Sequence, residues 1–182
     1  MRKKPMLAYP VNGKPVNYED KIFVQPKLDG VRCVIQAEPW VTNEASGYDV
    51  VAYSRTGKEW KNIDHILEQL RPFFKRFPDI ILDGELYNHD LRDDFNKIIS
   101  LVRKTKPTAE DRLDASNLTQ FHCYDIIDEA LSFEERNEFI ASTLMLQGDS
   151  IYFLDTVMVF DEDEAQSVHR SNLKKGYEGS IL

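Results

Sequence analysis

The segment Lys27-Leu28-Asp29-Gly30-Val31-Arg32 combines residue types that could carry out a covalent reaction on a phosphate. Its lysine follows a strand-like stretch, a turn signal comes next, and its arginine lies on the returning stretch. A lysine attacks phosphorus as a neutral amine, which is a minor species of an ordinary lysine at pH 7. An arginine offers five fixed donors that suit phosphate oxygens or sugar hydroxyls. The alternative is an ordinary surface hairpin with an exposed lysine.

Four later segments hold side chains of the kinds that bind nucleotides. They are Ser54-Arg55-Thr56-Gly57, Asp83-Gly84-Glu85-Leu86, Tyr124-Asp125 and Glu178-Gly179. Carboxylates are hard oxygen ligands that suit Mg²⁺, and a flat tyrosine ring can stack on a base. Each side chain also has a purely structural alternative, such as a solvated carboxylate, a core tyrosine or a surface arginine.

In this order, the five segments resemble the motifs of the covalent nucleotidyltransferases, the superfamily of DNA ligases, RNA ligases and mRNA capping enzymes. The segment that contains Lys27 resembles their nucleotidyl-lysine signature, and the similarity extends from Met6 to Leu182. Pro5-Met6-Leu7-Ala8 is similar to a phrase that often precedes the catalytic domain of DNA ligases. The whole chain is most similar to the small ATP-dependent DNA ligases of viruses and bacteriophages.

The resemblance implies a role for three of these residues at the sugar and phosphates of ATP. Lys27 becomes covalently attached to AMP, Arg32 lies beside the ribose, and Glu85 contacts the ribose and helps to hold a metal. The alternatives are a surface lysine, an exposed salt bridge for Arg32 and an ordinary turn carboxylate for Glu85.

The resemblance also implies roles at the base, at the metal and at DNA. Tyr124 corresponds to the aromatic residue that stacks on adenine, and Glu178 to a second carboxylate for Mg²⁺. Gln25 stands where many relatives have a glutamate that reads the adenine amine, and its amide oxygen can accept the same hydrogen bond. Arg55 is expected to contact a phosphate of DNA or AMP, whereas Asp125 is expected to be structural.

These roles predict an ATP-dependent DNA ligase core that uses ATP and Mg²⁺, forms a Lys27-AMP intermediate and seals nicked duplex DNA. We expect a cytoplasmic monomer with functions in DNA replication, repair or recombination. An RNA ligase or a capping-type nucleotidyltransferase is an alternative because the lysine signature is shared. A remnant that binds nucleotide or DNA without catalysis is another.

The apolar pattern predicts an α+β fold of antiparallel sheets flanked by helices, which the resemblance identifies as a nucleotidyltransferase (adenylation) domain with an ATP-grasp-like ligase core. The Asp29-Gly30 pair predicts that the first two strands form a hairpin, and the charged segment 104–117 is expected to be a loop. We expect strands at 21–25, 31–37, 50–54, 80–87, 121–127, 151–160 and 180–182, and helices at 62–77, 95–102, 133–144 and 161–175.

The domain organisation follows from the position of these elements. Residues 1–20 are rich in proline and glycine and are expected to form an extended N-terminal arm. Residues 21–182 are expected to form one folded adenylation domain. Since the sequence ends directly after the Glu178 motif, we expect this domain to be incomplete at its C-terminus and the oligonucleotide-binding (OB-fold) domain to be absent.

Composition excludes several classes of protein and of site. No apolar run approaches the roughly 20 residues that cross a bilayer, so no membrane association is expected. Cys33 and Cys123 lie in apolar, strand-like stretches and are expected to be buried and reduced. The formal net charge of −8 restricts contact with DNA phosphates to local basic clusters. Such clusters occur at Lys27, Arg32, Arg55, Lys58 and Lys61 and at Arg103, Lys104 and Lys106.

Overall fold

The computed structural model describes residues 5–8, 10–11, 14–144 and 148–182. The chain forms two compact units, of which the first is built mainly from Gly30–Phe153. The second consists of Met6–Asp29 and Leu154–Leu182, two segments that are distant in sequence. The chain therefore passes from one unit to the other directly after Asp29 and again after Phe153.

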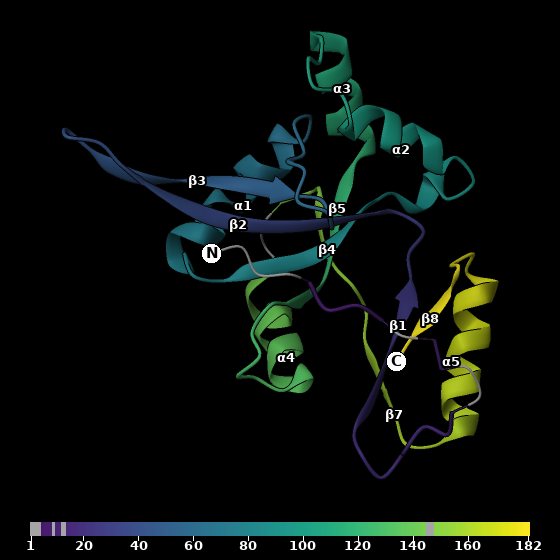
Figure 1. Cartoon of the computed structure of the whole chain (residues 1–182). Coiled ribbons are helices and arrows are strands. Elements are labelled where there is room, and N and C mark those ends of the chain that lie inside the picture. The colour runs from purple at the N-terminus through teal and green to yellow at the C-terminus, as the bar shows by residue number, and fades with distance from the viewer. Residues whose placement is uncertain (1–4, 9, 12–13, 145–147) are drawn as a thin grey trace. The chain divides into compact units, whose positions relative to one another are not determined.

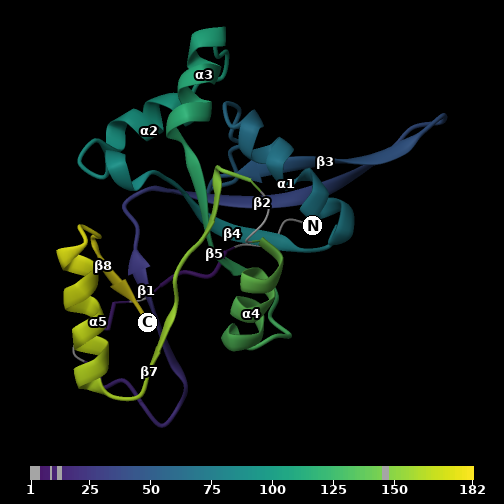
Figure 2. The same cartoon turned by 180° about the vertical axis from the view of Figure 1, so that it is seen from behind.

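A five-stranded sheet forms the centre of the first unit, with the strand order β3-β2-β4-β5-β6 (Figure 1). Neighbouring strands are antiparallel except β5 and β6, which are parallel. The β2–β3 hairpin extends beyond the rest of this sheet, because β4 pairs with β2 only as far as Gln36 (Figure 2). The strands are β2 (Val31–Val41), β3 (Ser46–Tyr53), β4 (Ile81–Tyr87), β5 (Gln120–Ile126) and β6 (Ile151–Phe153).

Alternation along the strands separates a core face of the sheet from a polar face. Leu82 and Leu86 of β4, and Phe121 and Cys123 of β5, belong to the core. The residues between them, such as Glu85, point to the other face. Helices α1 (Asp64–Arg76) and α4 (Phe133–Leu144) contribute to the same core with Ile66, Leu70, Phe73, Phe74, Ile140 and Leu144.

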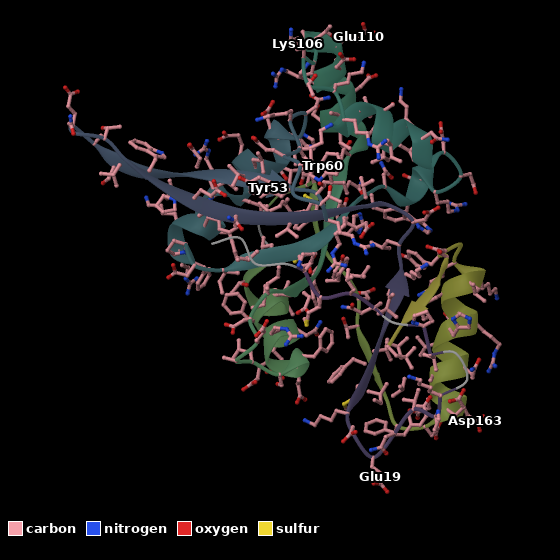
Figure 3. The ribbon with its side chains drawn as sticks, viewed as in Figure 1. Glu19, Tyr53, Trp60, Lys106, Glu110 and Asp163 are labelled. Carbon is pink, nitrogen blue, oxygen red and sulfur yellow. The ribbon has the colours of Figure 1, made fainter. Side chains whose placement is uncertain are left out.

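Three short helical elements complete the first unit. They are the 3₁₀ helix η1 (His89–Leu91) and the helices α2 (Phe95–Val102) and α3 (Ala109–Leu118). A capping box between Thr108 and Asp111 begins α3. Lys106 and Glu110 lie at the outer end of this helical segment (Figure 3).

The second unit contains a three-stranded antiparallel sheet with the order β7-β1-β8. Its strands are β1 (Ile22–Lys27), β7 (Val157–Val159) and β8 (Gly179–Ile181). Helix α5 (Glu162–Lys174) packs on this sheet and begins at Asp161, whose side chain accepts a hydrogen bond from the backbone of Glu164. Its buried core is small and consists of Val24, Val159 and Ala165, with Tyr18, Ile22 and Val168 packed against them.

The predicted α+β class is confirmed, and each predicted helix lies within two residues of the observed bounds. The predicted hairpin between residues 21–25 and 31–37 is wrong, because β1 pairs with β7 and β8 and not with β2. Gly30 instead allows a close approach within the first unit. A Cβ atom on Gly30 would lie 2.6 Å from both Glu85 Cγ and the carbonyl oxygen of Leu86.

Two further element predictions are wrong. The stretch 151–160 is not one strand, because it divides into β6 and β7, which belong to different sheets. The stretch 104–117 is not a loop, because it contains most of α3. This helix has no apolar stripe, so the apolar pattern of the sequence does not predict it. Ion pairs of Asp111 with Lys104 and of Arg112 with Asp64 accompany it.

The described residues between Pro5 and Asn17 contain no helix or strand. Residues 1–4, 9 and 12–13 of the predicted arm lie outside the described residues, and the extent of the adenylation domain stays a prediction. No helix in the described ranges is long and apolar enough to cross a membrane.

Candidate functional site

The second unit brings Lys27 and Glu178 together. Lys27 is the last residue of β1 and pairs with Gly179 of β8, and its carbonyl oxygen accepts a hydrogen bond of 3.2 Å from the backbone N–H of Glu178. Its Nζ forms an ion pair with Glu178 Oε1. The side chains remain 44% and 46% exposed, so solvent and ligands can reach both charges.

Gln25 lies two residues before Lys27 on β1 and is buried. Its Nε2 donates a hydrogen bond of 2.9 Å to Thr156 Oγ1, which fixes the plane of the amide. Its predicted role in reading adenine stays a prediction.

Helix α5 anchors the strand that follows Glu178. The buried Asn172 donates a hydrogen bond of 2.9 Å from Nδ2 to Ser180 Oγ, and His169 Nδ1 lies 3.2 Å from the same oxygen. These contacts hold β8 beside α5, and so position Glu178 one residue before the strand. The sequence reasoning missed Asn172, since a polar residue on a helix carries no local signal of its partner.

The first unit brings Arg32, Glu85 and Tyr124 together on the polar face of its sheet. Arg32 Nε donates a hydrogen bond of 2.7 Å to Asp83 Oδ1, and its Nη2 contacts Oδ2. The Arg32 guanidinium carbon lies 5.2 Å from the centre of the Tyr124 ring. The Tyr124 hydroxyl donates a hydrogen bond of 3.4 Å to Glu85 Oε2. Thus a cation, an aromatic ring and two carboxylates form one cluster.

Burial dominates the electrostatics of this cluster. Burial raises the pKa of Asp83, although the hydrogen bonds from Arg32 oppose the shift. Burial alone would lower the pKa of Arg32, but its hydrogen bonds to Asp83 leave that pKa raised. Burial and the nearby carboxylates raise the pKa of Tyr124 well above its usual value. At neutral pH, Tyr124 is therefore an uncharged ring that can donate a hydrogen bond.

Asp83 is buried and forms an ion pair with Arg32. The sequence predicted no role for Asp83, although the Asp83-Gly84-Glu85-Leu86 motif contains it. The alternative of an exposed salt bridge for Arg32 does not hold, because the Arg32 side chain is 21% exposed and that of Asp83 only 2%. The proposed contact of Arg32 with ribose stays a prediction.

Gly84 sets the position of Glu85. The register between β4 and β5 shifts at Asp83 and Gly84, as in a β-bulge. A Cβ atom on Gly84 would lie 2.4 Å from the carbonyl oxygen of His122. Only glycine allows this approach of the two strands.

Arg55 lies in a tight turn that the chain closes with its own hydrogen bonds. Gly57 has a φ of 92°, and its backbone N–H donates a hydrogen bond of 2.9 Å to the carbonyl oxygen of Ser54. The backbone N–H of Lys58 donates a hydrogen bond of 3.0 Å to Ser54 Oγ. Arg55 is exposed and has no hydrogen bond or ion pair with the part of the chain that the structure describes. This geometry is open to a phosphate ligand, but it equally fits a surface arginine.

The expected structural residues behave as predicted. Asp125 forms a buried ion pair with Arg136 of α4, with 2.7 Å between Arg136 Nε and Asp125 Oδ1. Cys33 and Cys123 are buried and free, and burial raises the pKa of both thiols well above the usual value.

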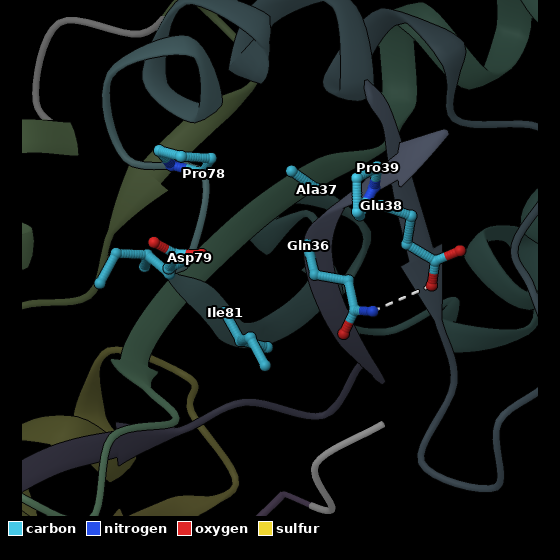
Figure 4. A pocket seen from close by; sticks show the side chains of 8 residues that line it. Gln36, Ala37, Glu38, Pro39, Pro78, Asp79 and Ile81 are labelled. Atoms are coloured by element: carbon cyan, nitrogen blue, oxygen red, sulfur yellow. Dashed lines mark hydrogen bonds between the residues drawn. The ribbon is translucent and has the colours of Figure 1, made fainter. Parts of the chain in front are cut away.

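Within the described ranges, no three His, Cys, Asp or Glu side chains are grouped to hold a metal ion. The two predicted metal carboxylates belong to different units, Glu85 to the first and Glu178 to the second. A cavity of about 400 Å³ in the first unit contains none of the predicted site residues (Figure 4). It is lined by Gln36, Ala37, Glu38 and Pro39 of β2 and by Pro78, Asp79, Ile80 and Ile81.

The structure therefore defines two sets of polar residues, Lys27 with Glu178 and Arg32 with Asp83, Glu85 and Tyr124, in an α+β chain. The sequence pattern of the family described as "ATP dependent DNA ligase domain" matches residues 5–182. The chain belongs to this family.

Comparison with individual proteins agrees with this assignment. A DNA ligase of African swine fever virus (isolate Pig/Kenya/KEN-50/1950) is 30% identical over 188 aligned residues, which cover 98% of this chain and 41% of the viral protein. The chain thus spans well under half the length of this relative.

Solved structures share the fold at lower identity. A Chlorella virus DNA ligase-adenylate has a TM-score of 0.58 at 22% identity, covering 97% of this chain and 58% of that one. An archaeal ATP-dependent RNA ligase has a TM-score of 0.60 at 17% identity, covering 99% and 44%. The fold alone therefore does not separate ligases of DNA from ligases of RNA.

Proposed function

We propose that this chain is the adenylating core of an ATP-dependent DNA ligase. The observation that carries the proposal is the β1–β8 pairing, which places the predicted nucleophile Lys27 in contact with the predicted metal carboxylate Glu178. Membership of the ligase family and the viral DNA ligase relative support DNA as the substrate.

In the proposed reaction, the neutral amine of Lys27 attacks the α-phosphorus of ATP. The N–P bond forms as the bond to the β-phosphate oxygen breaks, and pyrophosphate leaves with the electron pair. An oxygen of the 5′-phosphate at a nick in duplex DNA then attacks the AMP phosphorus, and the N–P bond breaks as the Lys27 amine leaves, so that AMP is joined to the DNA end by a phosphoanhydride bond. Attack by the 3′-hydroxyl on that activated phosphate seals the strand and releases AMP.

Glu178 controls the charge beside the nucleophile in this scheme. As long as Lys27 is paired with Glu178, its Nζ is directed at the carboxylate and not at a phosphate. Lys27 must leave the ion pair before it attacks as a neutral amine. Because both side chains are half exposed, this exchange requires little rearrangement of the protein.

The cluster of the first unit is proposed to bind the adenosine part of ATP. The ring of Tyr124 stacks on adenine, and Arg32 and Glu85 bind the ribose hydroxyls. Asp83 holds the Arg32 guanidinium with two hydrogen bonds and so fixes its orientation. Gln25 accepts the hydrogen bond of the adenine amine.

Glu85 in the first unit and Glu178 in the second are each proposed, on the resemblance, as a carboxylate ligand of Mg²⁺, which at phosphates commonly uses only one or two protein carboxylates. When bound, Mg²⁺ would polarise the phosphates and offset the charge that develops on pyrophosphate. Its use here, together with a monomeric state, a cytoplasmic location and roles in replication, repair or recombination, is proposed on the resemblance alone. Arg55 is proposed to contact a DNA phosphate.

Incubation with ATP labelled at the α-phosphate, in the presence of Mg²⁺, tests the proposal. We expect a covalent label that stays on the parent protein in a denaturing gel and no label on Lys27→Arg, which keeps the charge but not the nucleophile. Lys61→Arg is the matched control, because Lys61 also lies in an exposed ion pair, with Glu59. Labelling of Lys27→Arg at the parent level would contradict the proposal, and labelling from GTP in place of ATP would favour a capping-type enzyme.

A further inference from the structure

A row of side chains continues the adenosine cluster across the sheet of the first unit. The strand register places Arg32 of β2 opposite Glu85 of β4, Glu85 opposite His122 of β5, and His122 opposite Tyr152 of β6. Residues directly opposite each other on neighbouring strands share one face of a sheet. Tyr152 is therefore the last residue of the row that contains Glu85, and it lies on the edge strand of the sheet.

The ring of Tyr152 is held in place but remains open to solvent. It stacks on the His122 imidazole with a centroid distance of 4.8 Å and an angle of 9° between the planes. The side chain of Tyr87 meets the same imidazole edge-to-face at 5.3 Å. The Tyr152 side chain is nevertheless 41% exposed, and among the residues that the structure describes its one ring contact is the stack with His122. One face of the ring is occupied, and the opposite side lies at the sheet edge.

The His122 imidazole carries no charge at neutral pH. Burial, together with repulsion from His89, lowers the pKa of His122 to about 4, so the imidazole is neutral. Its Nε2 lies 3.0 Å from Gln120 Oε1 and is used inside the protein. A stacked ring pair whose imidazole is neutral suits the flat face of a base better than a phosphate, which requires positive charge.

The spacing relates this platform to the proposed ribose site. Glu85 and Tyr152 are two strands apart, or roughly 10 Å at about 4.8 Å per strand. This span equals about three nucleotides of a stacked strand at 3.4 Å each. A base can stack on Tyr152 only if its own face is exposed, as at a strand end or in an unpaired segment.

We propose that Tyr152, supported by His122, is a stacking platform for one unpaired nucleobase next to the nucleotide site. The relation to the nucleotide site rests on the function proposed above, whereas the platform itself rests on the geometry of the ring pair. The shared ligand chemistry is an exposed base face, which a polynucleotide strand or a free nucleotide could supply.

NMR titration of the 182-residue chain with hexathymidylate, and separately with thymidine monophosphate, tests the platform. Resonances of Tyr152 and His122 should shift, and Tyr152→Leu should weaken binding about five- to a hundredfold, the effect of one lost base–aromatic stack. Tyr152→Phe keeps the ring and should bind like the parent. Trp40→Leu is the matched control, because Trp40 is an aromatic residue of the same sheet that is 40% exposed.

Tighter binding of hexathymidylate than of the mononucleotide would assign the platform to a strand, and equal binding would assign it to a free nucleotide. Unchanged affinity of Tyr152→Leu, an equal loss in Trp40→Leu, or unmoved Tyr152 resonances at millimolar ligand would overturn the proposal. The assay contains no ATP, so its outcome is independent of whether Lys27 accepts AMP. The unaltered spectrum of Tyr152→Phe verifies that the fold is intact.

Discussion

Lys27 and Glu178 illustrate how an ion pair can matter for reactivity and little for folding. Exposed pairs contribute about 0 to 1 kcal/mol to the free energy of unfolding, and both side chains here are almost half exposed. The β1–β8 backbone ladder keeps the residues close whether or not the charges are paired. The pair therefore tolerates exchange of either partner for a ligand.

Glu178→Ala should accordingly reduce Mg²⁺-dependent labelling of Lys27 by AMP much more than it reduces stability. We expect a loss of at least tenfold in the labelling rate and a change in unfolding free energy below about 1 kcal/mol. Labelling across a Mg²⁺ titration and urea unfolding measure the two effects. Glu59→Ala, which removes the carboxylate of another exposed pair, should change neither. Identical Mg²⁺ curves for Glu178→Ala and the parent would remove Glu178 from the metal site.

His122 should make the stability of the protein depend on pH. Its pKa is about 4 in the folded chain and 6.5 in the reference state, so the folded state binds fewer protons than the unfolded state. The stabilising contribution is complete above pH 6.5 and is lost as the pH falls towards 4. A difference of about 2.5 pKa units corresponds to about 3 kcal/mol.

His122→Phe keeps a flat ring but removes this titration. The difference in unfolding free energy between pH 7.5 and 4.5 should be smaller in His122→Phe than in the parent by about 2 to 3 kcal/mol. Urea unfolding at both pH values measures it. His65, whose pKa burial also lowers, is unchanged in both proteins and cancels. Equal pH differences in the two proteins would show that His122 does not titrate as described.

At the residue scale, short motifs located the side chains with chemistry but not their supports. Lys27, Glu85 and Glu178 each belong to a short sequence motif that also contains a glycine. The support of Arg32 comes from Asp83, 51 positions away, and that of Ser180 from a helix residue, Asn172. Such pairs form only when strands and helices pack, so local patterns do not contain them.

At the scale of elements, the Arg136–Asp125 pair fastens α4 to β5 next to Tyr124. Both side chains are about one-tenth exposed. Arg136 Nη1 also donates a hydrogen bond of 2.8 Å to the carbonyl oxygen of Leu131. Removing one member of a buried pair leaves the other charge without compensation and typically costs about 3 to 5 kcal/mol. Removing both members costs less than the sum of the two single changes.

Asp125→Ala should therefore lower the unfolding free energy by about 3 kcal/mol or more, as should Arg136→Met. The double variant should lose less than the sum of the two, with a coupling energy of about 0.5 to 3 kcal/mol. Urea unfolding of the four proteins completes the cycle. Arg71→Met, in an exposed pair with Glu68, is the control and should change stability by less than about 1 kcal/mol. Additive losses in the cycle would mean that the two side chains do not act as a pair.

Helices and strands were predicted correctly where burial of one face gives the apolar residues a regular spacing. The predictions failed where the structure depends on residues that are distant in the sequence. The apolar spacing of α1 follows its packing on the core, and the strands around Glu85 and Tyr124 follow their one buried face. The turn signal Asp29-Gly30 suggested a hairpin, yet the glycine serves a close contact with Glu85 and Leu86. Helix α3 depends on its cap at Thr108 and on charge pairs, which apolar periodicity does not detect.

At the scale of the whole molecule, the two units differ in how they could fold. The first unit is built mainly from the continuous segment Gly30–Phe153 and contains the larger core. The second joins two segments across 124 intervening residues, a count that follows from its boundaries at Asp29 and Leu154. Among its described residues, the buried apolar cluster consists of Val24, Val159 and Ala165. Closing so long a loop costs entropy that a small core offsets poorly.

A chain consisting of residues 30–153 should consequently fold by itself, whereas peptides 6–29 and 154–182 should stay unfolded when mixed. The long segment keeps all five strands of its sheet together with α1 and α4, whose side chains fill the core. Circular dichroism and urea unfolding should show one cooperative transition for residues 30–153, with a smaller urea dependence than the full chain because less surface is exposed. The same segment should retain the Arg32–Tyr124 cluster but accept no label from ATP, since it lacks Lys27. Ile66→Ala within the segment should abolish or strongly weaken the transition, because a buried Ile→Ala change costs about 2 to 5 kcal/mol. A broad, non-cooperative transition for residues 30–153, alongside a cooperative one for the full chain, would mean that the first unit needs the second in order to fold.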